Sequence, residues 1–225
     1  MKVDIITPLA VIKLSIIHAA QGARFAKKSL GRSDSISPKG KELSSIIGVL
    51  DYNLLKKLAW NGPASGHDKF LQSIPFLVDV SMSRSMWQEM DTYRIGVSKQ
   101  SESTMHTLTK DNLSRSDFEL DINLVESETV LEYASRMINY FFVLRAEILV
   151  EREAGRISET ICRESLKKII PETFIQKRRM SLNYAVLKTM YVQRKNHRNK
   201  EWKYFFNHLM VLPNYCLWTG PSDII

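Results

Sequence analysis

The sequence has few of the residues that build the commonest metal, disulfide and phosphate-loop sites. Its two cysteines, Cys162 and Cys216, lie far apart in the chain, which argues against a disulfide scaffold and favours a reducing compartment. The five histidines lack the paired spacing of zinc or iron ligands, and neither common type of glycine-rich phosphate loop occurs. A metal hydrolase, a Rossmann dehydrogenase and a P-loop enzyme are therefore disfavoured.

Long hydrophobic runs are also missing. The amino-terminal stretch MKVDIITPLAVIKLSII is interrupted by Asp4, Pro8 and Lys13, so it lacks the continuous apolar core of a signal peptide. No other segment approaches the length needed to span a bilayer, and a cytoplasmic protein is the expectation. With 44% apolar and 25% charged side chains, the 225 residues resemble an ordinary folded protein, and we expect a single domain over residues 1–225.

The hydrophobic pattern predicts an α/β (α+β) protein with a small, mostly antiparallel sheet flanked by long helices. Short alternating segments predict strands over residues 2–7 and 76–82. Residues 91–108 are polar and dense in hydroxyl groups, so we interpret them as a surface or site-lining strand and loop. Apolar residues three and four apart predict helices over Ala10–Lys27, Leu43–Trp60, Thr129–Glu153, 181–195 and 199–210.

Two of these helices have a well-defined apolar stripe that we expect to face the core. In the helix over Leu43–Trp60, the stripe consists of Leu50, Leu54, Leu55 and Leu58. In the longest helix, it consists of Val130, Ala134, Met137, Ile138, Phe141, Phe142, Ile148 and Leu149.

The positive charge of the chain is concentrated near its end. Between Lys177 and Lys203 there are nine Lys or Arg and one acid, Glu201, so this window carries as much net charge as the formal +8 of the whole chain. A local positive field favours an anionic partner, with phosphate as the first candidate, in a nucleotide or in nucleic acid. The interleaved aromatic residues Tyr184, Tyr191 and Trp202 suit stacking on bases, although aromatic residues at helical spacing more often belong to a core.

Within this window, Asn183 and Arg194 are the most informative pair. Their separation is close to three helical turns, so a helix over 181–195 would place both side chains on one face. The alternative is a solvated basic face without a ligand. Upstream, Arg94 suits bidentate phosphate recognition or an ordinary surface ion pair. Ser103 has no base at a recognisable spacing, which favours hydrogen bonding or helix capping over a nucleophilic role.

Several motifs, in order along the chain, resemble those of the flavin-dependent thymidylate synthases. The segment LDYNLLKKLAWNGPASGHDKFLQSIPFLVDVSM is similar to the family's helix, Gly-His turn and strand. The family signature is Arg-His-Arg followed after seven residues by a serine. Here Thr92-Tyr93-Arg94 is followed, with one inserted residue, by Ser103, and the signature's last arginine falls on Met105. Thr92 and Tyr93 thus stand in place of the first arginine and the histidine.

The resemblance continues in the second half of the chain. LKKIIP resembles the stretch in which the family often has a phosphate-binding arginine, and Lys167 occupies that position. Asn183 and Arg194 have the family's separation of eleven residues, and Trp202 matches the tryptophan of the Gln-Trp-Glu element that follows.

The resemblance implies that the protein methylates C5 of a deoxyuridine nucleotide, with FAD as cofactor and folate and NADPH as co-substrates. It also implies a homotetramer with flavin sites where subunits meet. His67, Arg94 and Asn183 would hold flavin, Lys167 and Arg194 the nucleotide phosphate, and Ser103 would lie near the base. One alternative is a catalytically inactive homologue, such as a viral or phage accessory protein, that binds nucleotide or nucleic acid through residues 177–203. Another is a structural oligomer without a small ligand.

Overall fold

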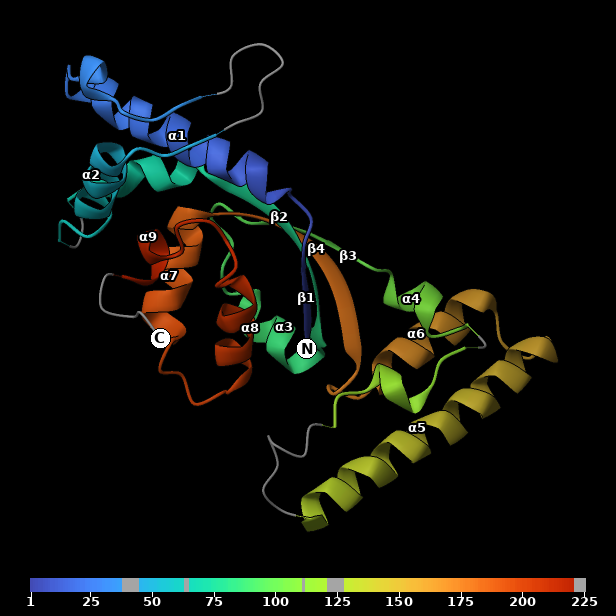
Figure 1. Cartoon of the computed structure of the whole chain (residues 1–225). Helices are drawn as coiled ribbons and strands as arrows, with labels where there is room; N and C mark the ends of the chain where they lie inside the picture. Colours follow the sequence, from blue (N-terminus) through green and yellow to red (C-terminus); the bar gives the residue numbers. More distant parts are fainter. Residues whose placement is uncertain (38–44, 63–64, 111, 121–127, 221–225) are drawn as a thin grey trace. The chain divides into compact units, whose positions relative to one another are not determined.

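The computed structural model describes residues 1–37, 45–62, 65–110, 112–120 and 128–220. One four-stranded sheet has the order β1-β2-β4-β3 (Figure 1). Two hydrogen bonds give the direction of the central pair: Arg84 N donates to Phe174 O, and Tyr184 N donates to Ile74 O. The sheet is antiparallel, which confirms the predicted α+β class. The strands are β1 (Lys2–Ile5), β2 (Pro75–Ser83), β3 (Ser98–Ser101) and β4 (Ile175–Asn183).

Helices account for most of the remaining regular structure. Those over Leu9–Ala26 and Glu128–Glu153 agree with the predicted ranges within one or two residues at each end. No helix among the described residues is long and apolar enough to cross a membrane. The helices are α1 (Leu9–Ala26), α2 (Val49–Ala59), α3 (Arg84–Met90), α4 (Thr104–Thr107), α5 (Glu128–Glu153), α6 (Glu159–Ile169), α7 (Tyr184–Arg194), α8 (Glu201–Leu209) and α9 (Cys216–Thr219).

The chain divides into two compact units that share the two central strands. Unit 1 consists of residues 1–2, 80–92 and 100–178, and unit 2 of residues 3–79, 93–99 and 179–225. Strands β2 and β4 each contribute residues to both units. The expectation of a single domain over residues 1–225 stays a prediction.

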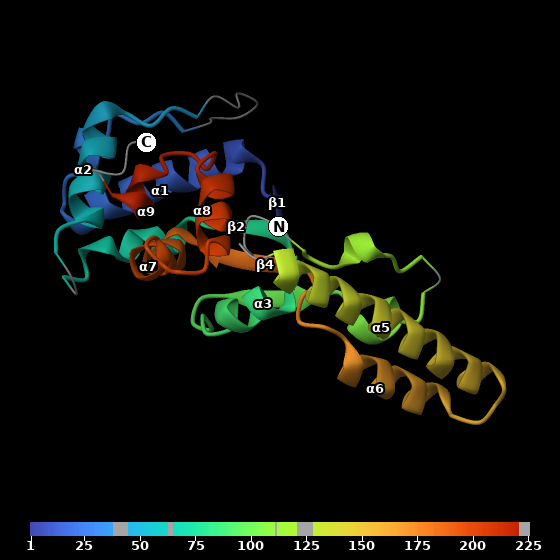
Figure 2. The ribbon, with the colours of Figure 1, turned by 90° about the horizontal axis from the view of Figure 1, so that it is seen from below.

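The core of unit 1 is a cluster of phenylalanines between α5 and α6, which lie side by side (Figure 2). The Phe118 ring lies 5.5 Å from the rings of Phe141 and Phe174, in tilted or edge contacts. Leu166 of α6 is fully buried in the same cluster. This packing fixes α6, which carries Lys167 on its exposed side.

The core of unit 2 is rich in tryptophan and tyrosine. Trp202 and Phe206 of α8 are stacked with 5.8 Å between ring centroids, and both are buried. Tyr184 is buried at the start of α7, where its hydroxyl donates to Pro213 O at 2.6 Å. The tryptophan and tyrosine that the sequence offered for base stacking therefore belong to the core.

Several sequence expectations were wrong in detail. The helix predicted from residue 181 begins at Tyr184, because β4 continues to Asn183 and the Asn183 side chain caps α7. Leu50, Val130 and Met137 were expected in buried stripes but are exposed. In the first turn of α2, the side chain that faces the core is that of Asp51, next to Leu50 in the chain. The helix predicted over Leu43–Trp60 begins only at Val49, and residues 45–48 are not helical. Residues 43 and 44 lie outside the described residues.

Candidate functional site

A cavity of about 360 Å³ in unit 1 brings together two of the residues singled out in the sequence, Ser103 and Lys167. It lies where the end of β3, the start of α4, the beginning of α3, the exposed side of α6 and β4 meet. Residues 101–105, in the last part of the segment 91–108 that was expected to be a surface or site-lining strand and loop, line this cavity. The lining residues are Arg84, Ser101, Glu102, Ser103, Thr104, Met105, Lys167, Gln176 and Arg178.

The cationic groups of this cavity differ in how much of their charge is available to a ligand. Lys167 makes no hydrogen bond or ion pair with any residue that the structure describes. Arg84 Nη2 lies 3.4 Å from Glu172 Oε1, a long and partly exposed ion pair. Both are positioned to meet an anion, together with the hydroxyl groups of Ser101, Ser103 and Thr104.

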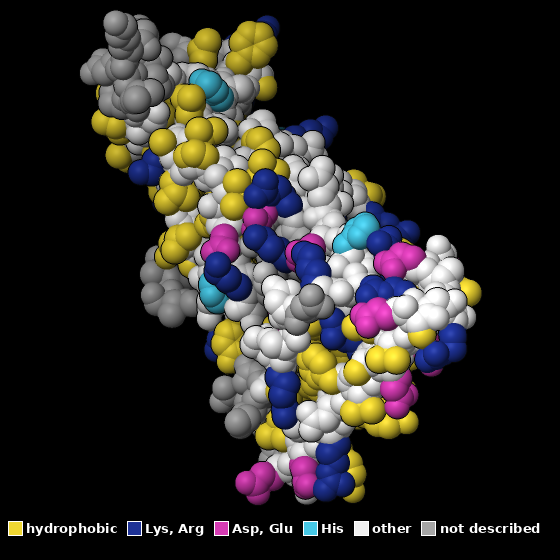
Figure 3. Space-filling model, turned by 90° about the vertical axis from the view of Figure 1, so that its right-hand side faces the viewer, with side chains coloured by type: hydrophobic (Ala, Val, Ile, Leu, Met, Phe, Trp, Pro, Cys, Tyr) yellow, Lys and Arg dark blue, Asp and Glu magenta, His cyan; other side chains and the backbone are white. Residues whose placement is uncertain are grey.

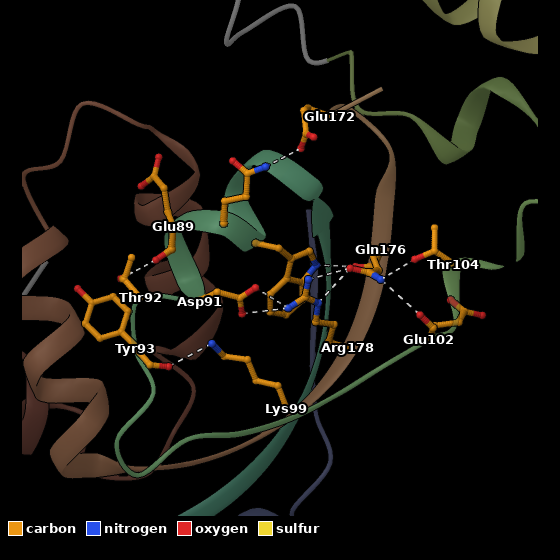
Figure 4. Close-up of polar contacts among 12 residues, drawn as sticks. Glu89, Asp91, Thr92, Tyr93, Lys99, Glu102, Thr104, Glu172, Gln176 and Arg178 are labelled. Atoms are coloured by element: carbon orange, nitrogen blue, oxygen red, sulfur yellow. Dashed lines mark hydrogen bonds and ion pairs between the residues drawn. The ribbon is translucent and has the colours of Figure 1, made fainter. Parts of the chain in front are cut away.

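Arg178, in contrast, is fully engaged within the fold. Its Nη1 donates to both carboxylate oxygens of Asp91 at 3.0 and 2.9 Å, and its guanidinium carbon lies 4.3 Å from the Trp87 ring centroid. Its Nε and Nη2 donate to Gln176 Oε1 at 3.0 and 2.9 Å. Asp91 neutralises its charge, so Arg178 serves mainly to hold Gln176 (Figure 4).

Gln176 in turn fixes the loop that carries the hydroxyl groups of the cavity. Its Nε2 donates to Thr104 Oγ1 at 3.0 Å and to the Glu102 carbonyl at 3.3 Å (Figure 4). Because Arg178 occupies the amide oxygen, the amide has one orientation, with both donors toward the loop. The Glu102 amide also donates to Lys177 O at 3.0 Å, so the loop is tied to β4 at several points.

Ser103 precedes α4 as its N-cap residue, and its hydroxyl forms no capping hydrogen bond. The Ser103 carbonyl accepts from the Thr107 hydroxyl at 3.0 Å and from the His106 amide at 3.2 Å. No histidine ring or carboxylate of a described residue bonds the Ser103 hydroxyl. It is therefore a hydrogen-bonding group at the cavity and has no partner that would activate it as a nucleophile.

The other predicted site residues belong to unit 2. Arg194, at the end of α7, donates from Nε to the Tyr93 hydroxyl at 3.2 Å. Asn183 caps the opposite end of α7 by accepting from Val186 N at 3.0 Å. Eleven residues of helix span about 16 Å, so the predicted sharing of one face does not bring Asn183 and Arg194 together.

His67 and Arg94 are both exposed in unit 2. His67 begins a 3-10 helix over His67–Ser73, directly after Gly66 in the left-handed conformation. Arg94 lies in a segment that passes close to the start of α7, where a Cβ at Gly96 would lie 2.9 Å from the Val186 side chain. Gly96 also has φ +71°, so glycine is required there for two reasons.

The hydrogen-bonding chemistry of these residues fits a flavin. The Asn183 Nδ2 group and the His67 ring make no hydrogen bond with a described residue, so both can serve carbonyl or phosphate acceptors. No group of three or more His, Cys, Asp or Glu side chains suited to a metal ion occurs within the described ranges.

The positive charge of the basic window, residues 177–203, is partly neutralised by acidic side chains in the structure. At least three of its nine cations are paired with acids: Arg178 with Asp91, Arg179 with Asp79 at 2.7 Å, and Lys188 with Asp68 at 2.8 Å. The run 177–179 lies on β4. On the face drawn in Figure 3, basic side chains are likewise interspersed with acidic ones.

Solved structures of similar architecture show which known fold the chain has. One is thymidylate synthase X (ThyX) from Helicobacter pylori with FAD and dUMP. It is 20% identical, with a TM-score of 0.65, over 97% of this chain and 96% of that one. The chain has the ThyX fold. A second ThyX structure from Helicobacter pylori, also complexed with FAD and dUMP, is 22% identical with a TM-score of 0.59, over 97% of both chains.

The match to ThyX confirms, at the level of the fold, the resemblance found in the sequence. No protein-family model and no curated protein sequence matches the chain. Sequence reasoning missed Arg84 and Gln176, which belong to no motif and reach the cavity only through the pairing of β2 with β4.

Proposed function

We propose that the protein is a ThyX-like enzyme that binds the phosphate of a deoxyuridine nucleotide in the cavity of unit 1. The observation that carries this proposal is the unpaired Lys167, which lines one cavity with Arg84 and three hydroxyl groups. The ThyX neighbours, solved with dUMP, support a pyrimidine nucleotide as the ligand. Lys167 also stands where the family resemblance expects a phosphate-binding cation.

Six side chains of the cavity have a role in this proposal. Lys167 and Arg84 neutralise the phosphate, and Ser101 and Thr104 donate hydrogen bonds to its oxygens. Ser103 lies near the base as a hydrogen-bonding group. Gln176 holds the loop of residues 102–104 in place, so the loop is ordered without a ligand.

The reaction we propose is methylation of C5 of the bound nucleotide. FAD, when bound and reduced, supplies a hydride, while folate supplies the one-carbon unit and NADPH the reducing equivalents. Asn183 Nδ2 and the His67 ring would donate hydrogen bonds to FAD, and Arg94 would contact its phosphates. The resemblance also assigns Arg194, in unit 2, to the substrate. These roles rest on the family resemblance and on the open donor groups described above.

We also propose self-association through α5, in line with the homotetramer that the resemblance implies. Val130, Tyr133, Met137 and Tyr140 are each more than half exposed and follow the three-four-three spacing of a helix-pairing seam. Tyr133, Met137 and Tyr140 line a cavity of about 680 Å³ in unit 1, together with Arg136 and Glu172. A second copy fits this surface, because a twofold contact places the same patch of both copies face to face. Arg136 of one copy can then meet Glu172 of the other.

A second candidate function is a nucleotide- or nucleic-acid-binding module without catalysis. Thr92, Tyr93 and Met105 in place of three signature residues favour this alternative. The acid partners of Arg178, Arg179 and Lys188 weaken it for nucleic acid, since these cations are already neutralised.

The test combines spectroscopy with product analysis. Purified protein is mixed with FAD, and a bound-flavin absorption spectrum that Asn183→Ala weakens supports the cofactor site. The protein is then incubated with dUMP, FAD, a methylene-bearing folate and NADPH, and thymidylate is measured by mass spectrometry. Product that disappears when any one component is left out supports the enzyme. Intact dUMP binding without flavin binding or product refutes the enzyme and leaves the binding module.

A further inference from the structure

A cavity of about 420 Å³ in unit 2 lies beside the end of α2 and the start of α9. Its volume falls within the roughly 300–1,000 Å³ that is typical of sites for small molecules. It shares no residue with the phosphate cavity of unit 1, and none of the roles proposed above uses it. The lining residues are Lys56, Lys57, Trp60, Asn61 and Cys216.

The indole of Trp60 is held in a fixed position on this lining. Trp60 Nε1 donates to the Cys216 carbonyl at 3.2 Å, and Lys188 Nζ lies 4.7 Å from the Trp60 ring centroid. Lys188 is itself fixed, because its Nζ donates to Asp68 at 2.8 Å and to the Ala59 carbonyl at 2.5 Å. Since Trp60 is only half-buried, part of its ring is open to a ligand.

The charged side chains that line the cavity are all positive, and no Asp or Glu is among its described lining residues. Lys57 is exposed and makes no hydrogen bond or ion pair with a described residue. Lys56 Nζ lies 4.6 Å from the Tyr52 ring centroid, a contact that does not neutralise its charge. Burial, followed by the neighbouring Cys216, raises the pKa of Tyr52 to about 12, so Tyr52 adds no negative charge near pH 7. Two ammonium groups therefore face the cavity without an acid on its lining.

We propose that this cavity is a ligand site for a small aromatic carboxylate. The aromatic part packs on the Trp60 indole, and the carboxylate accepts from the ammonium groups of Lys56 and Lys57 and from the Asn61 amide. A neutral aromatic compound would leave the two ammonium groups without a counter-charge, and an inorganic anion would leave the indole uncovered. The competing explanation needs no ligand, since lysines in the last turn of α2 also stabilise the helix through its dipole.

A pair of matched probes separates these explanations. 2-Naphthoate and its amide, 2-naphthamide, differ in the charged group and share the aromatic rings. Calorimetric titrations with both probes are made on the wild type, Lys57→Ala, Trp60→Leu and Lys13→Ala. Lys13→Ala is the control, because Lys13 is also an exposed helical lysine of unit 2 and does not line the cavity. Lys167→Ala shows whether the probe binds in the phosphate cavity of unit 1 instead.

Cys216 locates the bound probe by a second measurement. Its thiol is partly exposed on the cavity lining, whereas Cys162, the other cysteine of the chain, is fully buried. Alkylation by N-ethylmaleimide, followed by mass spectrometry, therefore reports on access to this cavity. 2-Naphthoate at ten times its Kd should slow the alkylation about tenfold, because only about one site in eleven is then free.

We expect 2-naphthoate to bind the wild type about tenfold more tightly than 2-naphthamide, because its carboxylate makes charge-assisted contacts. Lys57→Ala should weaken 2-naphthoate about five- to tenfold and leave 2-naphthamide unchanged. Trp60→Leu should weaken both probes about threefold or more, and if it does not fold, Lys57→Ala decides. Lys13→Ala and Lys167→Ala should bind both probes as the wild type does.

Several results would overturn the proposal. They are equal affinities of the two probes, unchanged 2-naphthoate binding in Lys57→Ala, and unchanged binding of both probes in a folded Trp60→Leu variant. A wild type that binds neither probe would overturn it too, and would leave the lysines with a role in helix stability alone. Weakening by Lys167→Ala, or alkylation of Cys216 that bound 2-naphthoate does not slow, would place the probe elsewhere and refute the site.

Discussion

Replacing Gln176 with glutamate tests whether the cavity of unit 1 holds an anion. The carboxylate keeps an acceptor for Arg178 but loses the two donors to the loop, at 3.0 and 3.3 Å. The first of these hydrogen bonds is partly buried and the second is exposed, so each is worth at most about 1 kcal/mol. A charged partner for Arg178 offsets much of their loss. We therefore expect Gln176→Glu to fold, with a free energy of unfolding within about 1–2 kcal/mol of the wild type.

The effect on binding should be much larger. A sphere of 360 Å³ is about 9 Å across, so an anion in the cavity lies within roughly that distance of the new charge. At an effective dielectric constant of about 20, two unit charges 9 Å apart repel by about 2 kcal/mol. That weakens dUMP binding about twentyfold, and more for a phosphate dianion.

The assay is calorimetric titration of dUMP at low and high salt, with urea unfolding as the check on folding. Asn112→Asp is the control, because it adds the same charge at an exposed residue of unit 1 that does not line the cavity. The difference between Gln176→Glu and the wild type should shrink as salt screens the repulsion. A folded Gln176→Glu variant that binds dUMP as tightly as the wild type would refute the location of the phosphate.

Three further predictions follow from the contacts. Lys167→Ala should weaken dUMP binding by about ten- to a hundredfold in the same titration without changing stability, whereas Lys168→Ala, its exposed neighbour outside the cavity, should do neither. Asp51→Asn should lower the free energy of unfolding in urea by about 3 kcal/mol at pH 7, because the buried carboxylate pairs with a guanidinium; a loss below 1 kcal/mol would contradict this. Met137→Glu should lower the molar mass of any oligomer measured by light scattering, and an unchanged mass would exclude the α5 surface as the contact.

The loss of stability expected for Asp51→Asn also depends on pH. Burial alone would raise the pKa of Asp51, but hydrogen bonds from Ser33 and Ser35 and the Arg24 guanidinium lower it overall. A carboxyl group with a lowered pKa in the folded state stabilises the fold above its unfolded pKa, near 4, and this contribution is lost as the pH falls through the folded value. The gap between wild type and Asp51→Asn should therefore narrow below about pH 4.

Long amphipathic elements were readable from the sequence because their pattern repeats over several turns. The helix α5 and the strand β2 were predicted within two residues at each end. The start of α7 was misplaced because β4 passes into the helix without a loop, so the alternating and helical patterns overlap there. The cap side chain of Asn183 decides the boundary, and a sequence window does not show which asparagine caps.

Only part of the candidate site could be predicted from the sequence. Ser103 and Lys167 came from the family resemblance and do meet in one cavity. The partners that set their surroundings come from far along the chain: Arg178 pairs with Asp91 across 87 residues. Such pairs depend on strand register, which local periodicity does not determine. For the same reason the basic window looked like one uniform field, although acids on other elements neutralise part of it.

The measurement that tests the central claim most directly is the ratio of the Kd values of deoxyuridine and dUMP for the wild-type protein. The two ligands differ only in the phosphate. If Lys167 and Arg84 both contact it, the phosphate should improve binding by at least about a hundredfold, since each charge-assisted contact is worth about 1.5–3 kcal/mol. Lys167→Ala should remove a large part of that ratio. Equal affinities for the two ligands in the wild type would contradict a phosphate site in this cavity.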